Sequence, residues 1–177
     1  MIILKIYLVR HGQVNHNLRR IYSREDEDLN ETGISEAYEL KENISNISYD
    51  LIISSPLKRA VQTANIINKY NKEIIIDERL RERDPGSLSG KSLEITNREE
   101  YWNYYSKIQY GTSENIREFF NRVKDFLDDL KTKDYESVII VAHSGVSKAF
   151  YGYFNGINDG KFLNLGLNNC EVKEYIL

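Results

Sequence analysis

Cysteine and proline are nearly absent from this chain of 177 residues. The single cysteine, Cys170, has no partner for an internal disulfide. Nothing therefore indicates the oxidising compartment of a secreted protein, and we expect a cytoplasmic location. Only two prolines occur, and no Pro-rich or Gly/Ser-rich stretch resembles a linker. Together with the length, this predicts one domain over residues 1–177.

Long apolar runs and an excess of positive charge are also missing. The apolar N-terminal stretch MIILKIYLV ends at Arg10 after nine residues. It is too short for a signal peptide or a membrane-spanning helix. The net charge of −3 argues against a general binder of nucleic acid or anionic membranes. We therefore expect neither nucleic acid nor a membrane as a partner, and no pattern indicates an oligomeric state.

Short apolar segments alternate with amphipathic segments along the chain. The strand-like runs cover residues 2–9, 49–55, 73–77, 137–143 and 170–177. The helix-like segments cover residues 29–44, 55–68, 115–130 and 144–154. Ser55 and Pro56 predict the cap and the first residue of the second helix. The alternation predicts an α/β fold, with helices on both faces of a mostly parallel central sheet.

Arginine and histidine stand where the predicted strands end. Arg10 and His11 follow the first strand, and His143 ends the fourth. Arg59 lies in the first turn of the helix after the second strand. Ligands of open α/β sheets bind at the carboxyl ends of the strands, so we expect these side chains to meet there. Arg59 could be a plain charge on a helix surface, but a cation in a first turn opposes the helix dipole and suggests a bound anion.

A phosphoryl group is the ligand that suits these side chains. Arginine binds phosphate oxygens bidentately, and the amides that open the helix after His143 add positive potential. Cationic arginines would repel a metal ion, so we expect no metal. A neutral histidine can attack phosphorus, and a nearby carboxyl such as Glu82 could protonate the leaving alcohol. Because arginines surround Glu82 in the sequence, a surface ion-pair cluster is an alternative explanation of this segment.

Five ordered blocks of the sequence resemble the histidine phosphatase superfamily, which includes the phosphoglycerate mutases. They are Arg10-His11-Gly12 with Asn17, DEDLNETG at 26–33, SPLKRAVQTA at 55–64, LRERDPGSLSG at 80–90 and AHSGV at 142–146. The resemblance runs from Ile2 to the end of the chain and leaves about 91–112 unmatched. It implies a phosphoglycerate mutase-like three-layer α/β/α fold, a small phosphorylated substrate, and no metal or organic cofactor.

The resemblance also implies a role for each matched position. His11 would be the phosphorylated nucleophile and Glu82 the proton donor, with Asp84 as the nearest other carboxyl. The phosphoryl group would be held by three further side chains, those of Arg10, Arg59 and His143. Asn17 and Ser144 would be further substrate-binding positions. Gly12 would let the backbone approach the phosphate.

Four positions depart from the family's pattern. Val14 stands where Thr or Ser is usual, Ser23 where Gly is common, Asp28 in place of a Pro, and Ser144 in place of a Gly. None is a charged or nucleophilic position of the predicted site. The departures therefore concern loop geometry and substrate preference more than the chemistry.

Other polar and aromatic segments have simpler explanations. His16 lies between two asparagines and is expected to be solvated, with a place at the mouth of the site as the alternative. The acidic run at 24–28 is expected to be a solvated loop. The aromatic residues of 101–105 indicate packing more than recognition.

The resemblance predicts a histidine acid phosphatase-type enzyme, a phosphomonoester hydrolase that works through a phosphohistidine intermediate. A phosphoglycerate mutase-type transferase is the alternative, and it must keep water from that intermediate. The mutases of the family look larger and cover the site with a long insertion and a C-terminal tail. Here the insertion at about 91–112, which we expect to act as a lid or specificity segment, is short, so hydrolysis is expected. A non-catalytic phosphate-binding regulatory domain would lack the nucleophile or the acid, and neither is missing.

Overall fold

A five-stranded sheet lies at the centre of the computed structural model, which describes residues 3–177. The strands are β1 (Lys5–Arg10), β2 (Leu51–Ser54), β3 (Ile74–Ile76), β4 (Ser137–Ala142) and β5 (Val172–Ile176). Their order is β3-β2-β4-β1-β5, and only β5 is antiparallel to its neighbour. The predicted mostly parallel sheet is confirmed. Ile2, which the first predicted strand includes, lies outside the described residues.

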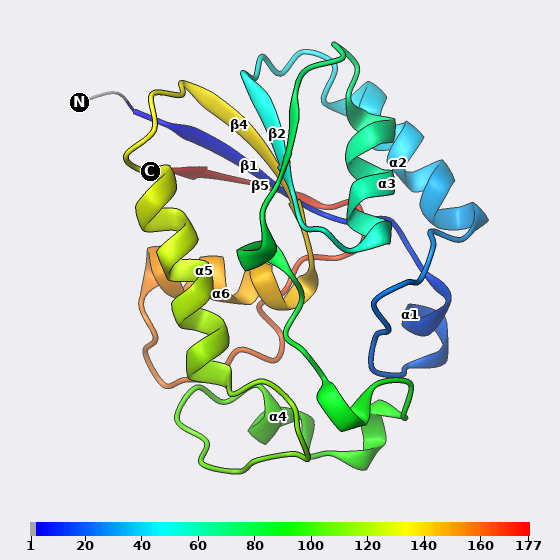
Figure 1. Cartoon of the computed structure of the whole chain (residues 1–177), viewed down its shortest axis with the longest axis vertical. Helices are drawn as coiled ribbons and strands as arrows, with labels where there is room; N and C mark the ends of the chain where they lie inside the picture. The colour runs from blue at the N-terminus through cyan, green and yellow to red at the C-terminus, as the bar shows by residue number, and fades with distance from the viewer. Residues whose placement is uncertain (1–2) are drawn as a thin grey trace.

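Helices cover both faces of this sheet, with α2 and α3 on one side and α5 and α6 on the other (Figure 1). The α-helices are α1 (Asn15–Arg19), α2 (Glu31–Asn43), α3 (Lys58–Ile67), α4 (Arg98–Tyr101), α5 (Ile116–Leu130) and α6 (Ser144–Asn155). Three single-turn 3-10 helices join them, η1 (Glu78–Leu80), η2 (Gly86–Leu88) and η3 (Leu93–Ile95). The three-layer α/β/α architecture is confirmed. Among residues 3–177, no helix combines the length and the apolar character needed to cross a bilayer.

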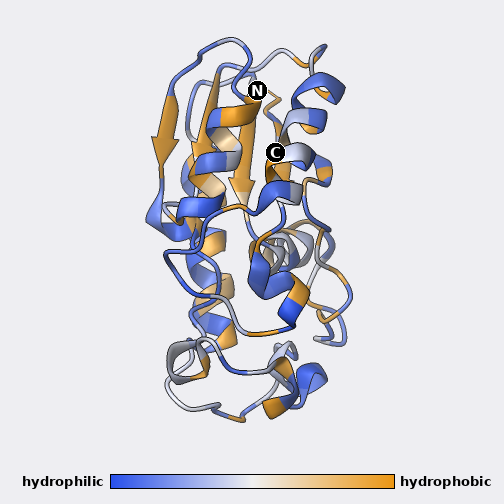
Figure 2. Cartoon of the chain, turned by 90° about the vertical axis from the view of Figure 1, so that its right-hand side faces the viewer, coloured by the Kyte–Doolittle hydropathy of each residue, from blue (hydrophilic) through white to orange (hydrophobic). Residues whose placement is uncertain are grey.

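The central strands are apolar throughout because successive residues enter two different cores. Ile6 and Leu8 of β1 belong to the core under α5 and α6, whereas Val9 belongs to the core under α2 and α3. In β4, Ile140 faces the first of these cores and Ile139 the second. Figure 2 shows the strands as mostly hydrophobic, and the helices with a polar side as well. A sheet covered on both faces requires this pattern.

The segment 91–112 contains η3 and α4 and packs beside the lower end of α5 (Figure 1). Tyr101 and Trp102 are buried in the α5–α6 core, where the Trp102 ring lies 6.3 Å from that of Phe119. Tyr105 is exposed. The expectation of aromatic packing is therefore confirmed for the first two residues of the cluster.

One predicted helix start is wrong. Helix α3 begins at Lys58, and its N-cap residue is Leu57, which caps with no side-chain hydrogen bond. The Ser55 hydroxyl accepts a hydrogen bond from the Leu57 amide at 3.3 Å, but it lies in the strand-to-helix turn rather than at the cap. The turn is two residues longer than the Ser-Pro signal predicts. The Ser55 hydroxyl is therefore available to another partner.

Candidate active site

A cavity of about 240 Å³ lies at the carboxyl end of β1, between that strand end and the segment 91–112. Six of the seven predicted site residues line it: Arg10, His11, Asn17, Arg59, Glu82 and Ser144. The seventh, His143, is 1% exposed and lies directly behind, with its ring centroid 5.1 Å from that of His11. Residues far apart in the chain therefore meet where the sheet topology predicts that they should.

His11 is held as a neutral imidazole with a defined tautomer. Its Nδ1 lies 2.7 Å from the carbonyl oxygen of Gly12. A carbonyl only accepts, so Nδ1 carries the proton and Nε2 carries the lone pair. Arg59 Nε donates to that Nε2 at 3.3 Å. Burial, with Arg59 and Arg10 nearby, holds the pKa of His11 well below 6.5. The lone pair of a nucleophilic nitrogen is thus available near neutral pH.

The role expected of Gly12 in approaching a phosphate stays a prediction, and the structure shows a separate reason for a glycine here. A Cβ on Gly12 would lie 2.4 Å from the carbonyl oxygen of Gly33, at the start of α2. The glycine is needed because two backbone segments touch here. This contact fixes the turn after β1 against α2, and so it positions His11 from behind.

His143 is the N-cap residue of α6 and is fully enclosed. Its Nε2 lies 2.7 Å from the Ser55 hydroxyl, and its Nδ1 has no hydrogen-bond partner within residues 3–177. Burial and the charge of Arg59 hold its pKa well below 6.5. Ser55, which sequence reasoning treated only as a helix cap, therefore orients this second histidine.

Arg10 and Arg59 bring two guanidinium groups to the cavity without a carboxylate partner among the described residues. Arg59 is 1% exposed, so the alternative of a surface charge is wrong. Its Nη1 donates to the carbonyl oxygen of Arg24 at 2.7 Å, and burial lowers its pKa to about 10. Arg10 Nη1 donates to the Leu167 carbonyl oxygen at 2.8 Å, while its buried Nε has no partner.

Glu82 points into the cavity and takes no part in an ion pair between described residues. Its Oε2 accepts from the Gly145 amide at 3.0 Å, and its Oε1 accepts from the Arg83 amide at 2.9 Å. The first contact places the carboxylate on the N-terminus of α6, where the helix dipole favours negative charge.

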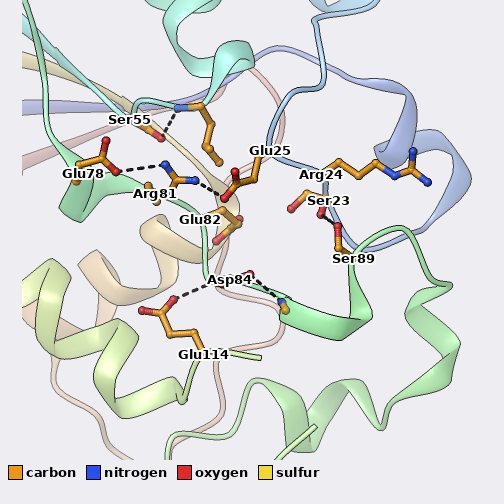
Figure 3. Close-up of polar contacts among 12 residues, drawn as sticks. Ser23, Arg24, Glu25, Ser55, Glu78, Arg81, Glu82, Asp84, Ser89 and Glu114 are labelled. Carbon is orange, nitrogen blue, oxygen red and sulfur yellow. Dashed lines mark hydrogen bonds and ion pairs between the residues drawn. The ribbon is translucent and has the colours of Figure 1, made fainter. Parts of the chain in front are cut away.

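The arginines around Glu82 in the sequence are engaged elsewhere. Arg81 pairs with Glu25 and Glu78 (Figure 3), and Arg79 pairs with Asp77 and Asp129. The ion-pair explanation is therefore wrong for Glu82 and right for Arg79 and Arg81, whereas the Arg83 guanidinium donates to the carbonyl oxygens of Glu114 and Tyr101.

Asp84, the other carboxyl near Glu82 in the chain, faces away from the site. It is exposed, and its Oδ1 accepts from the Gly86 amide at 2.7 Å. It lines a neighbouring cavity of about 340 Å³ together with Glu114 and Arg122. Its amide donates to Glu114 Oε2 at 3.0 Å (Figure 3). Position therefore favours Glu82 over Asp84 as the acid.

Asn17 and Val14 shape the loop beside His11. Asn17 Oδ1 accepts from the Val14 amide at 3.1 Å and from Asn169 Nδ2 at 3.3 Å. Asn169 Nδ2 in turn donates to the His11 carbonyl oxygen at 2.9 Å. The Val14 side chain is fully buried, so an apolar residue fits where the family usually has a hydroxyl.

His16 is buried, which contradicts the expectation that it is solvated. It is 7% exposed, and its Nδ1 lies 2.5 Å from Glu27 Oε2. Glu27 Oε1 also accepts from the His16 amide at 2.9 Å. The acidic run is exposed as expected except at Glu27, which binds His16 at the wall of the site. The alternative weighed for His16, a place lining the site, is the correct one.

Sequence reasoning missed three cations that line the cavity: Arg83, Arg98 and Lys148. Arg98 lies in the unmatched segment, and no motif singles out Arg83. Lys148 stands four residues after Ser144 on α6, so helical spacing alone places both on one face. Within residues 3–177, no group of three or more His, Cys, Asp or Glu side chains could hold a metal ion. The expectation that no metal is needed stays a prediction.

Comparison with known proteins identifies the family. The family model described as the histidine phosphatase superfamily, branch 1, matches residues 6–176. The chain belongs to this superfamily. The predicted family is therefore confirmed, while the roles predicted for single residues remain to be tested.

Relatives and solved structures of the histidine phosphatase superfamily match the chain over nearly its whole length. A candidate phosphoserine phosphatase 2 of Hydrogenobacter thermophilus is 34% identical over 96% of this chain and 88% of its own. Phosphoserine phosphatase 1 of the same organism is 31% identical over 94% and 83%. Other relatives carry provisional phosphoglycerate mutase names, such as GpmB of Proteus mirabilis. The structure of mycobacterial hydrolase 1 superposes with a TM-score of 0.86 at 21% identity, over 98% of this chain and 92% of the other, which shows the shared fold.

Proposed function

We propose that this histidine phosphatase superfamily member hydrolyses phosphate monoesters of a small metabolite through a phosphohistidine on His11. The observation that carries the proposal is the neutral His11, whose Nε2 lone pair is held beside Arg59 in the same cavity as Glu82. A nucleophile, cations and a carboxyl in one cavity are what the reaction requires. The relatives named as phosphatases support the same activity.

The first step transfers the phosphoryl group to His11. Nε2 attacks phosphorus, the P–N bond forms, and the ester P–O bond breaks. Arg59 shifts its hydrogen bond from Nε2 to a phosphoryl oxygen. The Gly12 carbonyl oxygen, which accepts the hydrogen bond from Nδ1, stabilises the positive charge that develops on the ring. The negative phosphoryl group bound beside Glu82 disfavours a second negative charge, so this carboxyl takes up a proton in the substrate complex and donates it to the leaving oxygen.

The second step releases inorganic phosphate. Glu82, now a carboxylate, takes a proton from water as the water oxygen attacks phosphorus and the P–N bond breaks. His11 returns to its neutral form and Glu82 to its acid form. Two buried atoms without a protein partner among the described residues, Arg10 Nε and His143 Nδ1, lie near His11 and are suited to phosphoryl oxygens. Preorganised hydrogen-bond donors of this kind stabilise the charge of the transition state.

Labelling of the intermediate tests this mechanism. Wild-type protein quenched during turnover of a ³²P-labelled monoester should carry acid-labile phosphate, and His11→Ala should carry none. Glu82→Gln with p-nitrophenyl phosphate should accumulate more label than wild type, because this leaving group needs no proton, whereas the attacking water must give up a proton to a base. Equal labelling of wild type and His11→Ala would exclude His11 as the nucleophile.

A transferase of the phosphoglycerate mutase type remains the second candidate because relatives carry that name. The ratio of phosphoryl transfer to hydrolysis on 3-phosphoglycerate distinguishes the two. Hydrolysis should dominate, and dominant transfer would favour the mutase.

A further inference from the structure

The cavity carries more positive charge than a phosphate monoester can balance. Five cationic side chains line it (Arg10, Arg59, Arg83, Arg98 and Lys148), against one carboxylate, Glu82. Both His11 and His16 have lowered pKa values and add little positive charge near neutral pH. A phosphate monoester brings at most two negative charges, so cations remain for a second anionic group.

The five cations differ from other arginines and lysines that lie close to the site. Arg79, Arg81 and Arg122 each pair with a carboxylate. Within residues 3–177, none of the five cavity cations lies within 4.0 Å of a carboxylate oxygen. Buried charges are normally paired, so cations left without partners at a cavity wall suggest an anionic ligand.

Lys148 is the lysine among the five cavity cations, and it is buried. It is 5% exposed, and its Nζ donates to the Leu163 carbonyl oxygen at 2.8 Å. The ammonium lies 5.1 Å from the centroid of the Trp102 ring, and burial lowers its pKa to about 8. An ammonium has three donors, and the described protein atoms use one of them at hydrogen-bond distance.

Ser144 adds a hydroxyl beside this ammonium. A Cβ built on Gly166 would lie 2.3 Å from Ser144 Oγ and 2.6 Å from Lys148 Nζ, so both polar atoms flank the bare backbone of this glycine. The pair lies on α6, whereas Arg10 and His11 lie at the end of β1. The cavity therefore offers two separate groups of donors, one beside the nucleophile and one on the helix.

We propose that Lys148 is a specificity-determining residue that binds a carboxylate of the substrate, so that the preferred substrates are small phosphorylated carboxylic acids. The proposal rests on the proposed phosphatase activity. The volume supports a carboxylate over a second phosphate, because about 240 Å³ is below the range of roughly 300–1,000 Å³ common for ligand pockets. A phosphoryl group and a three-carbon acid suit a space of this size.

Two pairs of substrates that differ in the carboxylate test this proposal. The pairs are O-phosphoserine with phosphoethanolamine, and 3-phosphoglycerate with glycerol 3-phosphate. For wild type, kcat/KM should be roughly tenfold to a hundredfold higher for the acid of each pair, which is the range expected for a charge-assisted hydrogen bond. Lys148→Met should reduce both ratios to near one, and Lys148→Arg should retain most of the preference. Lys124→Met, an exposed position on α5, is the control that should keep both ratios.

A second measurement uses only the wild-type protein. The groups that act electrostatically on the Lys148 ammonium are Glu82, Arg98 and Arg10. Above a pH of about 8 the ammonium loses its proton, so the 3-phosphoglycerate to glycerol 3-phosphate ratio should fall with rising pH. This pair has no amine that titrates in the same range.

The outcomes separate this proposal from the proposed function. Wild-type ratios near one, or a preference that survives in Lys148→Met, would overturn the role of Lys148 while leaving the phosphatase activity intact. Preference for 1,3-propanediol bisphosphate over 3-phosphoglycerate would make the second anion a phosphate and would overturn the carboxylate. Failure to release phosphate from every monoester, including p-nitrophenyl phosphate, would overturn the proposed function itself.

Discussion

Replacing Gly145 with alanine is expected to impair acid catalysis although no reacting group is replaced. A Cβ at this position would lie 2.0 Å from Glu82 Oε1 and 2.7 Å from Trp102 Cη2. Cβ contacts under 3.0 Å are essentially never seen, so the carboxylate must retreat by about 1 Å or more. The buried Trp102 ring on the other side limits compensation by a shift of α6.

A displacement of about 1 Å at a reacting group can cost on the order of a hundredfold in rate. General acid catalysis contributes roughly 10²–10⁴, so the loss fits within what Glu82 can supply. We expect kcat/KM of Gly145→Ala to fall about a hundredfold for alkyl phosphates, whose leaving oxygen needs a proton. The fall should be under about tenfold for p-nitrophenyl phosphate, whose leaving group does not.

The assay compares kcat/KM for the two substrate classes in wild type, Gly145→Ala and Glu82→Gln. Both variants should show the same dependence on the leaving group, because both disable the same carboxyl. Thermal unfolding followed by circular dichroism checks that each variant is folded. Equal losses on both classes of substrate in folded Gly145→Ala would refute the reasoning, as would full activity on alkyl phosphates.

Three further predictions concern stability. Burial lowers the pKa values of His11 and His143 below the 6.5 of an unfolded chain, so the unfolded state binds more protons below that pH. The free energy of urea unfolding should thus be nearly constant between about pH 7 and 8 and fall below about 6.5, by up to about 1.4 kcal/mol per pH unit and histidine; a profile that stays flat below pH 6.5 would contradict it. Arg122→Met should lower the free energy of unfolding by about 2–3 kcal/mol, because Arg122 donates to three backbone carbonyls and pairs with Glu114. An unchanged urea midpoint would show that these contacts do not stabilise the fold. Lys148→Met should raise the melting temperature of the ligand-free protein by calorimetry, because a buried, unpaired ammonium is removed; a lower value would contradict this.

The fold was largely predictable because its determinants are local and periodic. Apolar β-branched runs alternating with amphipathic segments specify the strands and helices, and the topology rules for α/β units place their carboxyl ends together. Helix starts were less predictable. The Ser55-Pro56 signal resembles a cap, yet α3 begins at Lys58 because the turn instead directs the Ser55 hydroxyl to His143. Tertiary contact outweighed local preference at this position.

The predicted site was limited to residues that stand in motifs at the ends of strands. Arg10, His11 and Arg59 come together as expected. His16 was misjudged because the partner that buries it, Glu27, lies in a run that resembles a solvated loop. Helical spacing places Lys148 on the same face of α6 as Ser144, but no motif distinguishes it from a side chain of the buried helix face. Its role depends on what lies opposite, and that information exists only in the folded chain.

The distribution of ion pairs separates the parts of the molecule that serve stability from the part that serves binding. Arg79 and Arg122, outside the site, hold loops together and have carboxylate partners that compensate their charge. Arg59 and Lys148 are buried more deeply, yet they have only neutral partners, and burial lowers their pKa values to about 10 and about 8. Such groups oppose folding of the empty protein, since desolvation of a charge costs more than neutral hydrogen bonds return. They become favourable only when an anion enters, so the stability lost in the empty state reappears as affinity for the substrate and its transition state.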